Sequence, residues 1–346
     1  MNIYGLAPVS GACHWYRIRE PLRGLAGIGH TTAWGELFDE TIVARHDTIL
    51  THILHGEQES QAWEYLDEAG QHRLIYDIDD NVWAYDPTTN HGQYWNAERL
   101  AQVETNIRRA HLVTTPSPVL ARIIQFERGL NANVAVLGNY VPSWLLGLGI
   151  SRPEVFTIGY QGAPQKIHQS DLDEIQEELF LFLTRFSDAR LVFYGQPKVP
   201  EGAGSLADRI TAVPWTPDVP AYYRSLYGMT VGLGPLRPSP FTDAKSGIRA
   251  VEYAALGMPG VFSDVAAYRP VVTNNETGYL IRDPHDWRAV LSKLYRRPEL
   301  VTSVGHKARV RAQAWTTEQN AWRFEQAYQS SGPGAASSSR ILPAPT

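Results

Sequence analysis

The stretch Pro235–Ser263, PLRPSPFTDAKSGIRAVEYAALGMPGVFS, decides how this chain folds. An apolar run ends at its first proline, so we expect a buried strand to lead into a polar, proline-rich loop. From Lys245 the apolar residues recur at helical spacing, and Gly257 and Pro259 mark the end of that helix. A second strand is expected at 260–262. The stretch therefore predicts a strand, a loop, a helix and a strand, in that order.

The start of this helix is a candidate anion site. The first amides of a helix have no partners inside it, and the positive end of its dipole favours a phosphate. Lys245, Ser246 and Gly247 stand at that start, and Glu252 follows one and a half to two turns later. A carboxylate there would suit the sugar diol of a nucleotide. The alternative from the residues alone is an ordinary strand, loop and helix unit of an α/β protein.

The same residues resemble the C-terminal signature of retaining glycosyltransferases with the GT-B fold, glycosyltransferase family four in particular. The matching segments are Pro235–Leu236, Ala244–Ser246, Val251–Pro259 and Phe262–Asp264. In that family a loop, a helix start and a helix-borne glutamate hold a nucleotide-sugar. The family's Glu-x7-Glu motif is incomplete here, because Ala244 occupies the first glutamate position. The resemblance then assigns the donor sugar hydroxyls to Asp243 or to backbone amides.

Composition sets limits on the class of protein. A chain of 346 residues with 43% hydrophobic content is long enough for two domains, as GT-B requires. A net charge of −5 with dispersed signs does not indicate nucleic-acid binding. The single cysteine, Cys13, excludes an intramolecular disulfide and fits a reducing compartment, so we expect a cytoplasmic protein. No stretch reaches the roughly 18 apolar residues of a membrane span.

The resemblance predicts an α/β fold with two Rossmann-like, doubly wound domains that face a central cleft, and a last helix that crosses back to the first domain. The expected parts are an acceptor-side domain at 1–145 completed by helix 316–329, a linker at 146–154, a nucleotide-sugar domain at 155–315, and a disordered tail at 330–346. The tail is assigned from its Ser, Pro, Gly and Ala content.

Apolar runs separated by helical patterns place strands in both halves. The strands are expected at 2–6, 48–54, 73–78, 111–114 and 133–137 in the first half, and at 155–160, 191–194, 210–215, 229–234 and 260–262 in the second. Helices are expected between them, which is the alternation of a parallel sheet.

Two positions at strand ends in the first half are candidate binding residues. The segment Gly11–Pro21 resembles the opening loop of the family's acceptor domain, where Gly11 would lie against the donor phosphates. A glycine that only makes a turn is the alternative. His52 falls at the carboxyl end of a predicted strand, where ligands of doubly wound sheets bind, and it is a candidate for contacting an acceptor hydroxyl.

Three carboxylates follow the strand at 73–78, in the sequence Asp77-Ile-Asp79-Asp80. Their mutual repulsion is expected to raise at least one pKa, which would suit a proton acceptor or a hydroxyl clamp, so Asp79 and Asp80 are acceptor-side catalytic candidates. The same residues contain Asp-x-Asp, the metal-nucleotide motif of GT-A transferases. A metal-dependent GT-A-like enzyme that uses Asp77 and Asp79 is therefore an alternative, as is a purely structural capping role.

The polar segment 86–95 is expected to be a loop that carries His91 and Tyr94. Rings in a loop over a rigid sheet can stack on a sugar, so both are acceptor-binding candidates. Packing against the helix expected at 97–109 is the alternative.

The second half contains another strand followed by a glycine loop and a helix. Gly162 would allow close approach of the donor, and Lys166 would neutralise the diphosphate, unless it is a solvated surface lysine. In the family, a Gly, a His and an Asp recur in this order near the start of a helix, and His168 fits this pattern. Trp215 is a candidate neighbour of the nucleotide base.

Taken together, the resemblance implies a glycosyltransferase that moves a sugar from a nucleotide-diphosphate donor to an acceptor hydroxyl on a small molecule, glycan or protein. Lys245, Ser246, Gly247 and Lys166 would stabilise the departing diphosphate, so neither a metal nor a cofactor is expected. Retention of the anomeric configuration is expected from the family. Two further functions fit the same residues: a nucleotide-sugar binder without transfer activity, and a nucleotide-sugar epimerase.

Overall fold

The strands at the centre of the first sheet are buried on both faces, although they contain polar residues as well as apolar ones. In the computed structural model, which describes residues 1–330 except 8–10, 151–152, 163–165, 196–198 and 201, Thr48–His52 is buried at every position. Such strands are typical of parallel sheets covered by helices on both sides. The tail from residue 331 onward, which was expected to be disordered, lies outside the described residues.

The chain forms two units. One is Met1–Pro142 with Asp243–Ser246 and the segment from Thr316, and the other is Ser143–Thr242 with Gly247–Trp315. The N-terminal segment of the first unit ends at Pro142, whereas the sequence predicted that this segment would extend to residue 145.

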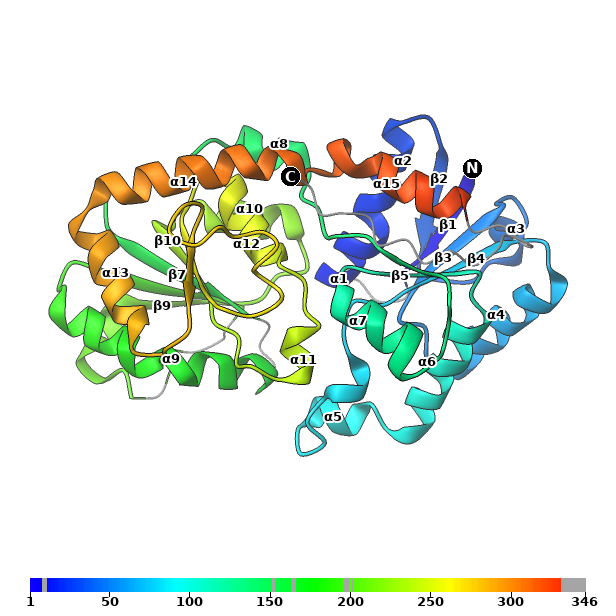
Figure 1. Ribbon diagram of the computed structural model, residues 1–346, viewed down its shortest axis with the longest axis horizontal. Helices are drawn as coiled ribbons and strands as arrows, with labels where there is room; N and C mark the ends of the chain where they lie inside the picture. Colours follow the sequence, from blue (N-terminus) through cyan, green and yellow to red (C-terminus); the bar gives the residue numbers. More distant parts are fainter. Residues whose placement is uncertain (8–10, 151–152, 163–165, 196–198, 201, 331–346) are drawn as a thin grey trace. The chain divides into compact units, whose positions relative to one another are not determined.

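The first unit is built around a parallel sheet with the strand order β2-β1-β3-β4-β5-β6 (Figure 1). Its strands are β1 (Asn2–Leu6), β2 (Thr31–Gly35), β3 (Thr48–His52), β4 (Arg73–Asp77), β5 (Leu112–Thr115) and β6 (Val134–Val136). Its helices include α1 (Ala12–His14), α2 (Glu20–Gly27), α3 (Glu40–Val43), α4 (Glu57–Ala69), α5 (Asn90–Tyr94), α6 (Ala97–Arg109), α7 (Pro118–Arg122) and α15 (Thr317–Gln329). Short π-helical turns continue α1 and α7, at Trp15–Arg19 and Ile123–Glu127.

The second unit has a parallel sheet with the order β12-β11-β10-β7-β8-β9. Its strands are β7 (Thr157–Gln161), β8 (Arg190–Tyr194), β9 (Ile210–Val213), β10 (Val231–Gly234), β11 (Gly260–Ser263) and β12 (Tyr279–Ile281). Its helices include α8 (Ser143–Gly147), α9 (Lys166–Arg185), α10 (Val219–Leu226), α11 (Pro240–Asp243), α12 (Ile248–Ala255), α13 (Asp286–Arg296) and α14 (Pro298–Ala312).

The C-terminal helix α15 packs against α2 in the first unit (Figure 1). Gly24 allows this close approach, because a Cβ atom there would lie 2.8 Å from the Thr317 methyl group and 3.3 Å from the Ala321 Cβ. Thr317 Oγ1 also donates a hydrogen bond of 2.8 Å to the buried Glu20 carboxylate. The last described helix is thus a structural part of the unit that contains the N-terminus.

The Gly24→Val variant is expected to lose about 1–3 kcal/mol of stability, because overpacking forces α15 away from α2. Gly27→Val in the same helix is the matched control, since nothing lies within 4 Å of the added Cβ there. Urea unfolding of both variants measures the difference. Equal stabilities would show that the contact between α2 and α15 is not tight.

Three local features differ from the sequence-based expectations. The edge strand β2 was not predicted, because its residues are half exposed and lack an apolar run. The segment expected as a loop at 86–95 contains α5. The helix expected from Lys245 begins at Ile248, after a separate turn of helix, α11.

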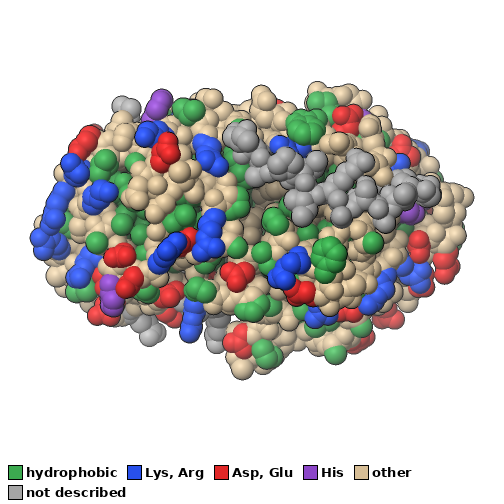
Figure 2. All heavy atoms as spheres, viewed as in Figure 1, with side chains coloured by type: hydrophobic (Ala, Val, Ile, Leu, Met, Phe, Trp, Pro, Cys, Tyr) green, Lys and Arg blue, Asp and Glu red, His purple; other side chains and the backbone are tan. Residues whose placement is uncertain are grey.

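The surface carries both signs of charge. Figure 2 shows Lys and Arg side chains interspersed with Asp and Glu on the viewed face, in keeping with the net charge of −5. Among the described residues, no helix combines the length and the apolar character that a bilayer crossing requires.

Candidate active site

The strand order places a candidate site in each unit. In a doubly wound sheet, ligands bind at the carboxyl ends of the strands where the strand order reverses. The reversal lies between β1 and β3 in the first unit, and between β7 and β10 in the second. The residues that follow these four strands are therefore the candidates for binding.

Glu252 lies at the reversal point of the second unit. Its side chain is only 4% exposed, and its Oε2 accepts hydrogen bonds from Gln161 Nε2 (2.8 Å) and Tyr222 OH (3.1 Å). Burial, and then the neighbouring carboxylate, raise the pKa of Tyr222 well above its ordinary value, so its hydroxyl stays protonated and donates. The glutamate is thereby held at the end of β7 by residues from β7 and α10.

The loop after β10 is held in place by two side chains. The buried Asp171 of α9 accepts a 2.8 Å hydrogen bond from the Arg237 amide, and Ser263 Oγ accepts one of 2.9 Å from the Leu236 amide. Further along, Gly247 has to be glycine, because a Cβ atom there would lie 2.6 Å from the Ala267 carbonyl oxygen. These contacts fix the path of the chain up to the start of α12.

The N-terminus of α12 carries a cation that the sequence patterns did not indicate. Gly247 is the N-cap and gives no side-chain hydrogen bond to the helix amides. Arg249, in the first turn, is half-buried, and its guanidinium carbon lies 5.6 Å from the ring centroid of Tyr160. Among the described residues it forms no ion pair with a carboxylate. This end of α12 therefore combines helix amides with an arginine.

Of the other residues that were predicted to bind the donor, the structure describes Gly162 and Trp215 but not the side chains of Lys166 and His168. The side chains of Lys166 and His168 lie outside the described residues, although α9 begins at Lys166. Gly162 follows β7 directly, and a Cβ atom there would lie 2.8 Å from the Tyr160 hydroxyl, so packing alone accounts for this glycine. Trp215 follows β9 and is 47% exposed.

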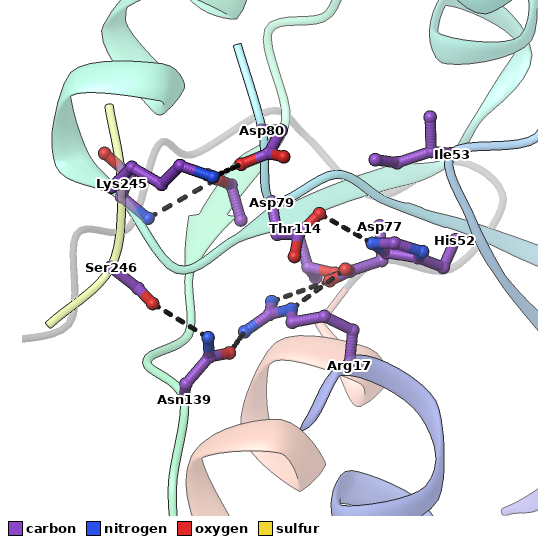
Figure 3. Close-up of polar contacts among 12 residues, drawn as sticks. Arg17, His52, Ile53, Asp77, Asp79, Asp80, Thr114, Asn139, Lys245 and Ser246 are labelled. Atoms are coloured by element: carbon purple, nitrogen blue, oxygen red, sulfur yellow. Dashed lines mark hydrogen bonds and ion pairs between the residues drawn. The ribbon is translucent and has the colours of Figure 1, made fainter. Parts of the chain in front are cut away.

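The first unit contains a buried ion pair between Arg17 and Asp77, the last residue of β4 (Figure 3). Arg17 donates from Nε to Asp77 Oδ1 (2.9 Å) and from Nη2 to Oδ2 (2.7 Å), with 0% and 1% of the two side chains exposed. Thr114 donates to the same carboxylate. Arg17 Nη1 donates to Asn139 Oδ1 (2.7 Å), and Asn139 Nδ2 donates to Ser246 Oγ (2.9 Å). This network connects β4 to the segment before α12.

Asp79 pairs with the predicted acceptor residue His52, with 2.8 Å between Oδ1 and Nε2. Burial raises the pKa of Asp79, but the charges of His52 and Arg17 outweigh it and lower that pKa overall. The expectation that repulsion among the three carboxylates raises a pKa is thus wrong for Asp79. Burial lowers the pKa of His52, but Asp79 outweighs it and raises that pKa overall.

Asp80 pairs with Lys245, which the sequence pattern assigned to the donor diphosphate. Lys245 Nζ donates to Asp80 Oδ1 (2.8 Å), and the Tyr85 hydroxyl donates to Oδ2 (2.9 Å). Burial lowers the pKa of Lys245, but Asp80 outweighs it and raises that pKa overall. Each of the three carboxylates at the end of β4 therefore has its own cation, which explains why they tolerate one another.

Aromatic side chains surround Tyr85. The ring of His91 lies 4.6 Å from that of Tyr85, and the Trp95 ring is stacked parallel to it at 6.3 Å. The Tyr94 hydroxyl lies 2.6 Å from His55 Nε2, and its ring is 44% exposed. The predicted acceptor residues His91 and Tyr94 thus belong to one cluster that is joined to Asp80 through Tyr85.

Neither the backbone nor packing requires a glycine at position 11. The φ angle of Gly11 is 172°, an extended conformation open to any residue, and an added Cβ would meet no atom of the described residues within 4 Å. The alternative of a turn-making glycine therefore has no support.

Asp243, the last residue of α11, is half-buried and is grouped with the first unit.

The metal-binding alternative relied on Asp77 and Asp79. Both oxygens of Asp77 are already bonded to Arg17, so this carboxylate is poorly placed to bind a metal ion. Within the described part of the chain, no three His, Cys, Asp or Glu side chains are grouped as a metal site.

Several site residues were missed because their partners are far away in sequence. Arg17 and Asp77 are 60 positions apart, and Gln161 and Glu252 are 91 apart. Arg17 stands in the sequence Tyr-Arg-Ile-Arg, within the segment Gly11–Pro21 that resembles the family, but its burial is visible only in the structure.

His14 lies beside His52 and affects how the stability of the protein changes with pH. Its ring contacts that of His52 edge to face, with 5.0 Å between the centroids. Burial, and next the neighbouring His52, lower the pKa of His14 from 6.5 to about 4. Between these two values the unfolded chain binds a proton that the folded chain does not, so stability is lost as the pH falls through this window.

We expect the His14→Gln variant to lose less stability than the wild type between pH 6.5 and pH 4. The difference between the two proteins should change by more than about 1 kcal/mol over this window. Urea unfolding at several pH values measures it. Parallel stability curves for the two proteins would contradict the expected titration.

The second unit matches a known protein family. Residues 152–297 match the family described as Glycosyl transferases group 1. Comparison with curated protein sequences gives no match.

Solved structures resemble the chain over most of its length. Sucrose-phosphate synthase from Thermosynechococcus elongatus has a TM-score of 0.65 at 16% identity, covering 95% of this chain and 98% of that one. HepE from Anabaena, in complex with UDP and glucose, has a TM-score of 0.65 at 13% identity, covering 95% and 100%. The pneumococcal O-GlcNAc transferase GtfA, in complex with UDP and GlcNAc, has a TM-score of 0.58 at 12% identity, covering 82% and 56%.

At these identities the likeness to solved structures establishes the fold alone. The expected fold class, GT-B with two doubly wound parallel sheets, is confirmed. A GT-A-like architecture is therefore excluded.

Proposed function

We propose that this chain, whose residues 152–297 match the family described as Glycosyl transferases group 1 and whose fold resembles solved GT-B structures, moves a sugar from a nucleotide-diphosphate donor to an acceptor hydroxyl. One observation carries the proposal. The matched segment contains the reversal point between β7 and β10. At that point α12 carries the buried Glu252, and its N-terminus has no side-chain cap.

In this proposal the donor diphosphate binds at the N-terminus of α12. The helix amides after Gly247 supply hydrogen bonds, and Arg249 supplies a positive charge that no described carboxylate neutralises. Gly162, Lys166 and His168 remain donor-side candidates from the loop after β7. Glu252 would bind the ribose, with Gln161 and Tyr222 orienting its carboxylate.

Charge develops on the diphosphate as the bond to the sugar breaks. Groups that bind this charge more strongly in the transition state than in the ground state accelerate the reaction. Arg249 and Lys245 are the cations proposed for this role, with Ser246 and Gly247 contributing hydrogen bonds. For Lys245 this requires exchange of its bond to Asp80 for one to phosphate.

The acceptor is proposed to bind at the carboxyl end of the first sheet. His52, Asp79 and Asp80 lie there beside the reversal point between β1 and β3, and hydroxyl groups are natural partners for such side chains. The cluster of His91 and Tyr94 extends this surface with rings that can stack on a sugar. The acceptor is proposed to be a small molecule, a glycan or a protein.

We propose that the reaction needs no metal, because protein cations and helix amides neutralise the leaving group. Retention of the anomeric configuration is proposed from the family resemblance. Proton NMR of the product would show the anomeric configuration directly. Excess EDTA is expected to leave the transfer rate unchanged. Loss of turnover in EDTA with recovery on adding Mg²⁺ would contradict metal independence.

A panel of nucleotide-sugars tests donor binding. A donor at 100 times its Kd should stabilise the protein by about 2.7 kcal/mol and raise its melting temperature. The matching nucleoside diphosphate is expected to stabilise it as well, because the contacts are assigned to the nucleotide and diphosphate. If no nucleotide-sugar in the panel changes the melting temperature, the proposed function is wrong.

The residue at the first glutamate position favours a second candidate function. Ala244 is fully buried and belongs to the hydrophobic core of the first unit, so it cannot hold a donor hydroxyl. A nucleotide-sugar binder without transfer activity would have this feature. It predicts a donor-induced rise in melting temperature without release of nucleoside diphosphate, either by transfer or by hydrolysis.

A further inference from the structure

His14 lies at the point where ligands of the first sheet are expected. It follows the loop after β1, and its ring contacts His52 at the end of β3, so the two histidines span the reversal point between β1 and β3. The ring of His14 is half-buried. Among the described residues, neither of its nitrogens has a hydrogen-bond partner. A polar ring without a partner in this position points to a ligand.

The neighbours of His14 favour the neutral form of its ring. His52 is bound to Asp79 at 2.8 Å, and this carboxylate raises the pKa of His52. Burial, and next the neighbouring His52, lower the pKa of His14 to about 4. His14 is therefore neutral at physiological pH, with one ring nitrogen able to accept a hydrogen bond and the other able to donate one.

The charges of the surrounding cluster are already paired. Arg17 binds Asp77, His52 binds Asp79, and Lys245 binds Asp80. Because Lys245 is assigned to the donor diphosphate, an acceptor with a carboxylate or a phosphate would have to displace Asp77 from Arg17 or Asp79 from His52, at a considerable cost. A neutral hydroxyl can bond to His14 without such a displacement.

We propose that His14 accepts a hydrogen bond from a hydroxyl of an uncharged polyol, such as a neutral sugar, and so positions the neighbouring hydroxyl that reacts. As the oxygen of the reacting hydroxyl bonds to the sugar and the bond from the sugar to the diphosphate breaks, its proton passes to the departing diphosphate. The proposal rests on the proposed glycosyltransferase function and specifies its acceptor class. The His52–Asp79 pair orients His14 through the ring contact.

The role assigned to His14 is positioning rather than general base catalysis. Its low pKa, about 4, makes it a weak base that would remove little of the hydroxyl proton. A hydrogen bond from one hydroxyl of the acceptor to a neutral imidazole nevertheless fixes the orientation of the reacting hydroxyl beside it, which lowers the entropic barrier.

The test compares transfer with hydrolysis of the same donor. The donor is the nucleotide-sugar that most stabilises the wild type, and the acceptor probes are glycerol and methyl α-glucoside, with glucuronic acid and glucose 6-phosphate as their charged counterparts. His14→Phe keeps a ring but removes both nitrogens, whereas His14→Gln keeps an oxygen acceptor. His306→Gln, at an exposed site in α14, controls for loss of a histidine elsewhere.

We expect His14→Phe to lower kcat/KM for the neutral probes by about 10- to 100-fold. Donor affinity and the slow hydrolysis of the donor by water should not change, because these do not involve the acceptor hydroxyl. His14→Gln should recover part of the loss, and His306→Gln should equal the wild type. The wild type should use the neutral probes in preference to the charged ones.

Three results would overturn the inference while leaving the proposed function intact. They are an unchanged kcat/KM in His14→Phe, a preference of the wild type for the charged probes, and donor hydrolysis without transfer to either neutral probe. A wild type that neither binds nor hydrolyses any nucleotide-sugar would instead overturn the proposed function, and the inference with it.

Discussion

The Arg249→Met variant is expected to transfer sugar with a kcat about 10²- to 10³-fold below that of the wild type. The guanidinium is the proposed source of positive charge at the start of α12, and the diphosphate gains negative charge only as the sugar leaves. An interaction that strengthens in the transition state affects kcat, whereas uniform binding of the donor affects only KM. Steady-state kinetics with a saturating donor separates the two effects.

Stability and a matched variant serve as controls for Arg249. Because this arginine has no described carboxylate partner, its loss leaves no unpaired negative charge and should change stability by less than about 1 kcal/mol. Arg249→Lys should retain part of the activity. Arg282→Met removes an exposed arginine of the same unit that pairs with Asp264, and it should transfer sugar normally. An Arg249→Met enzyme with full kcat would remove this residue from the proposed donor site.

The Arg17→Met variant is expected to lose about 3–5 kcal/mol of stability. Both side chains of the Arg17–Asp77 pair are almost completely buried, so removal of the cation leaves a charged carboxylate without its main partner in the core of the first unit. Two further acceptors, Leu137 O and Asn139 Oδ1, lose their donor as well. A loss of this size approaches the whole stability of a typical domain.

A second substitution makes this prediction specific to the buried charge. Adding Asp77→Asn to Arg17→Met removes the unpaired carboxylate and should recover a substantial part of the stability. Arg108→Met is the matched control, since its pair with Glu104 lies at the surface and should be worth less than about 1 kcal/mol. Urea unfolding followed by circular dichroism measures all four proteins. A loss for Arg17→Met no larger than that for Arg108→Met would contradict the account of this ion pair.

The fold was largely predictable from sequence, because buried parallel strands read as short apolar runs. The strands β1 and β4 begin where expected, at Asn2 and Arg73, since the residues at the centre of each are buried and apolar. The edge strand β2 gave no such signal, because it is partly exposed. The start of α12 was placed three residues early, since Lys245 bonds to Asp80 instead of entering the helix.

The candidate site was only partly predictable, because its chemistry depends on contacts between distant segments. The sequence placed His52 and Asp79 at strand ends, and in the structure the two side chains form a pair. The sequence could not show that each carboxylate at the end of β4 meets its own cation, and the expected pKa rise was therefore wrong for Asp79. Arg249 was overlooked because the pattern of an amphipathic helix does not show whether an arginine has a carboxylate partner.

The most direct test of the central claim is the stoichiometry of the reaction. The protein is incubated with the nucleotide-sugar that most raises its melting temperature and with a neutral polyol, and the products are quantified by mass spectrometry. The account predicts one nucleoside diphosphate released for each sugar found on the polyol or on water, and about 10²- to 10³-fold less product with Arg249→Met over the same time. Tight donor binding with no release of nucleoside diphosphate, even after long incubation, would contradict it.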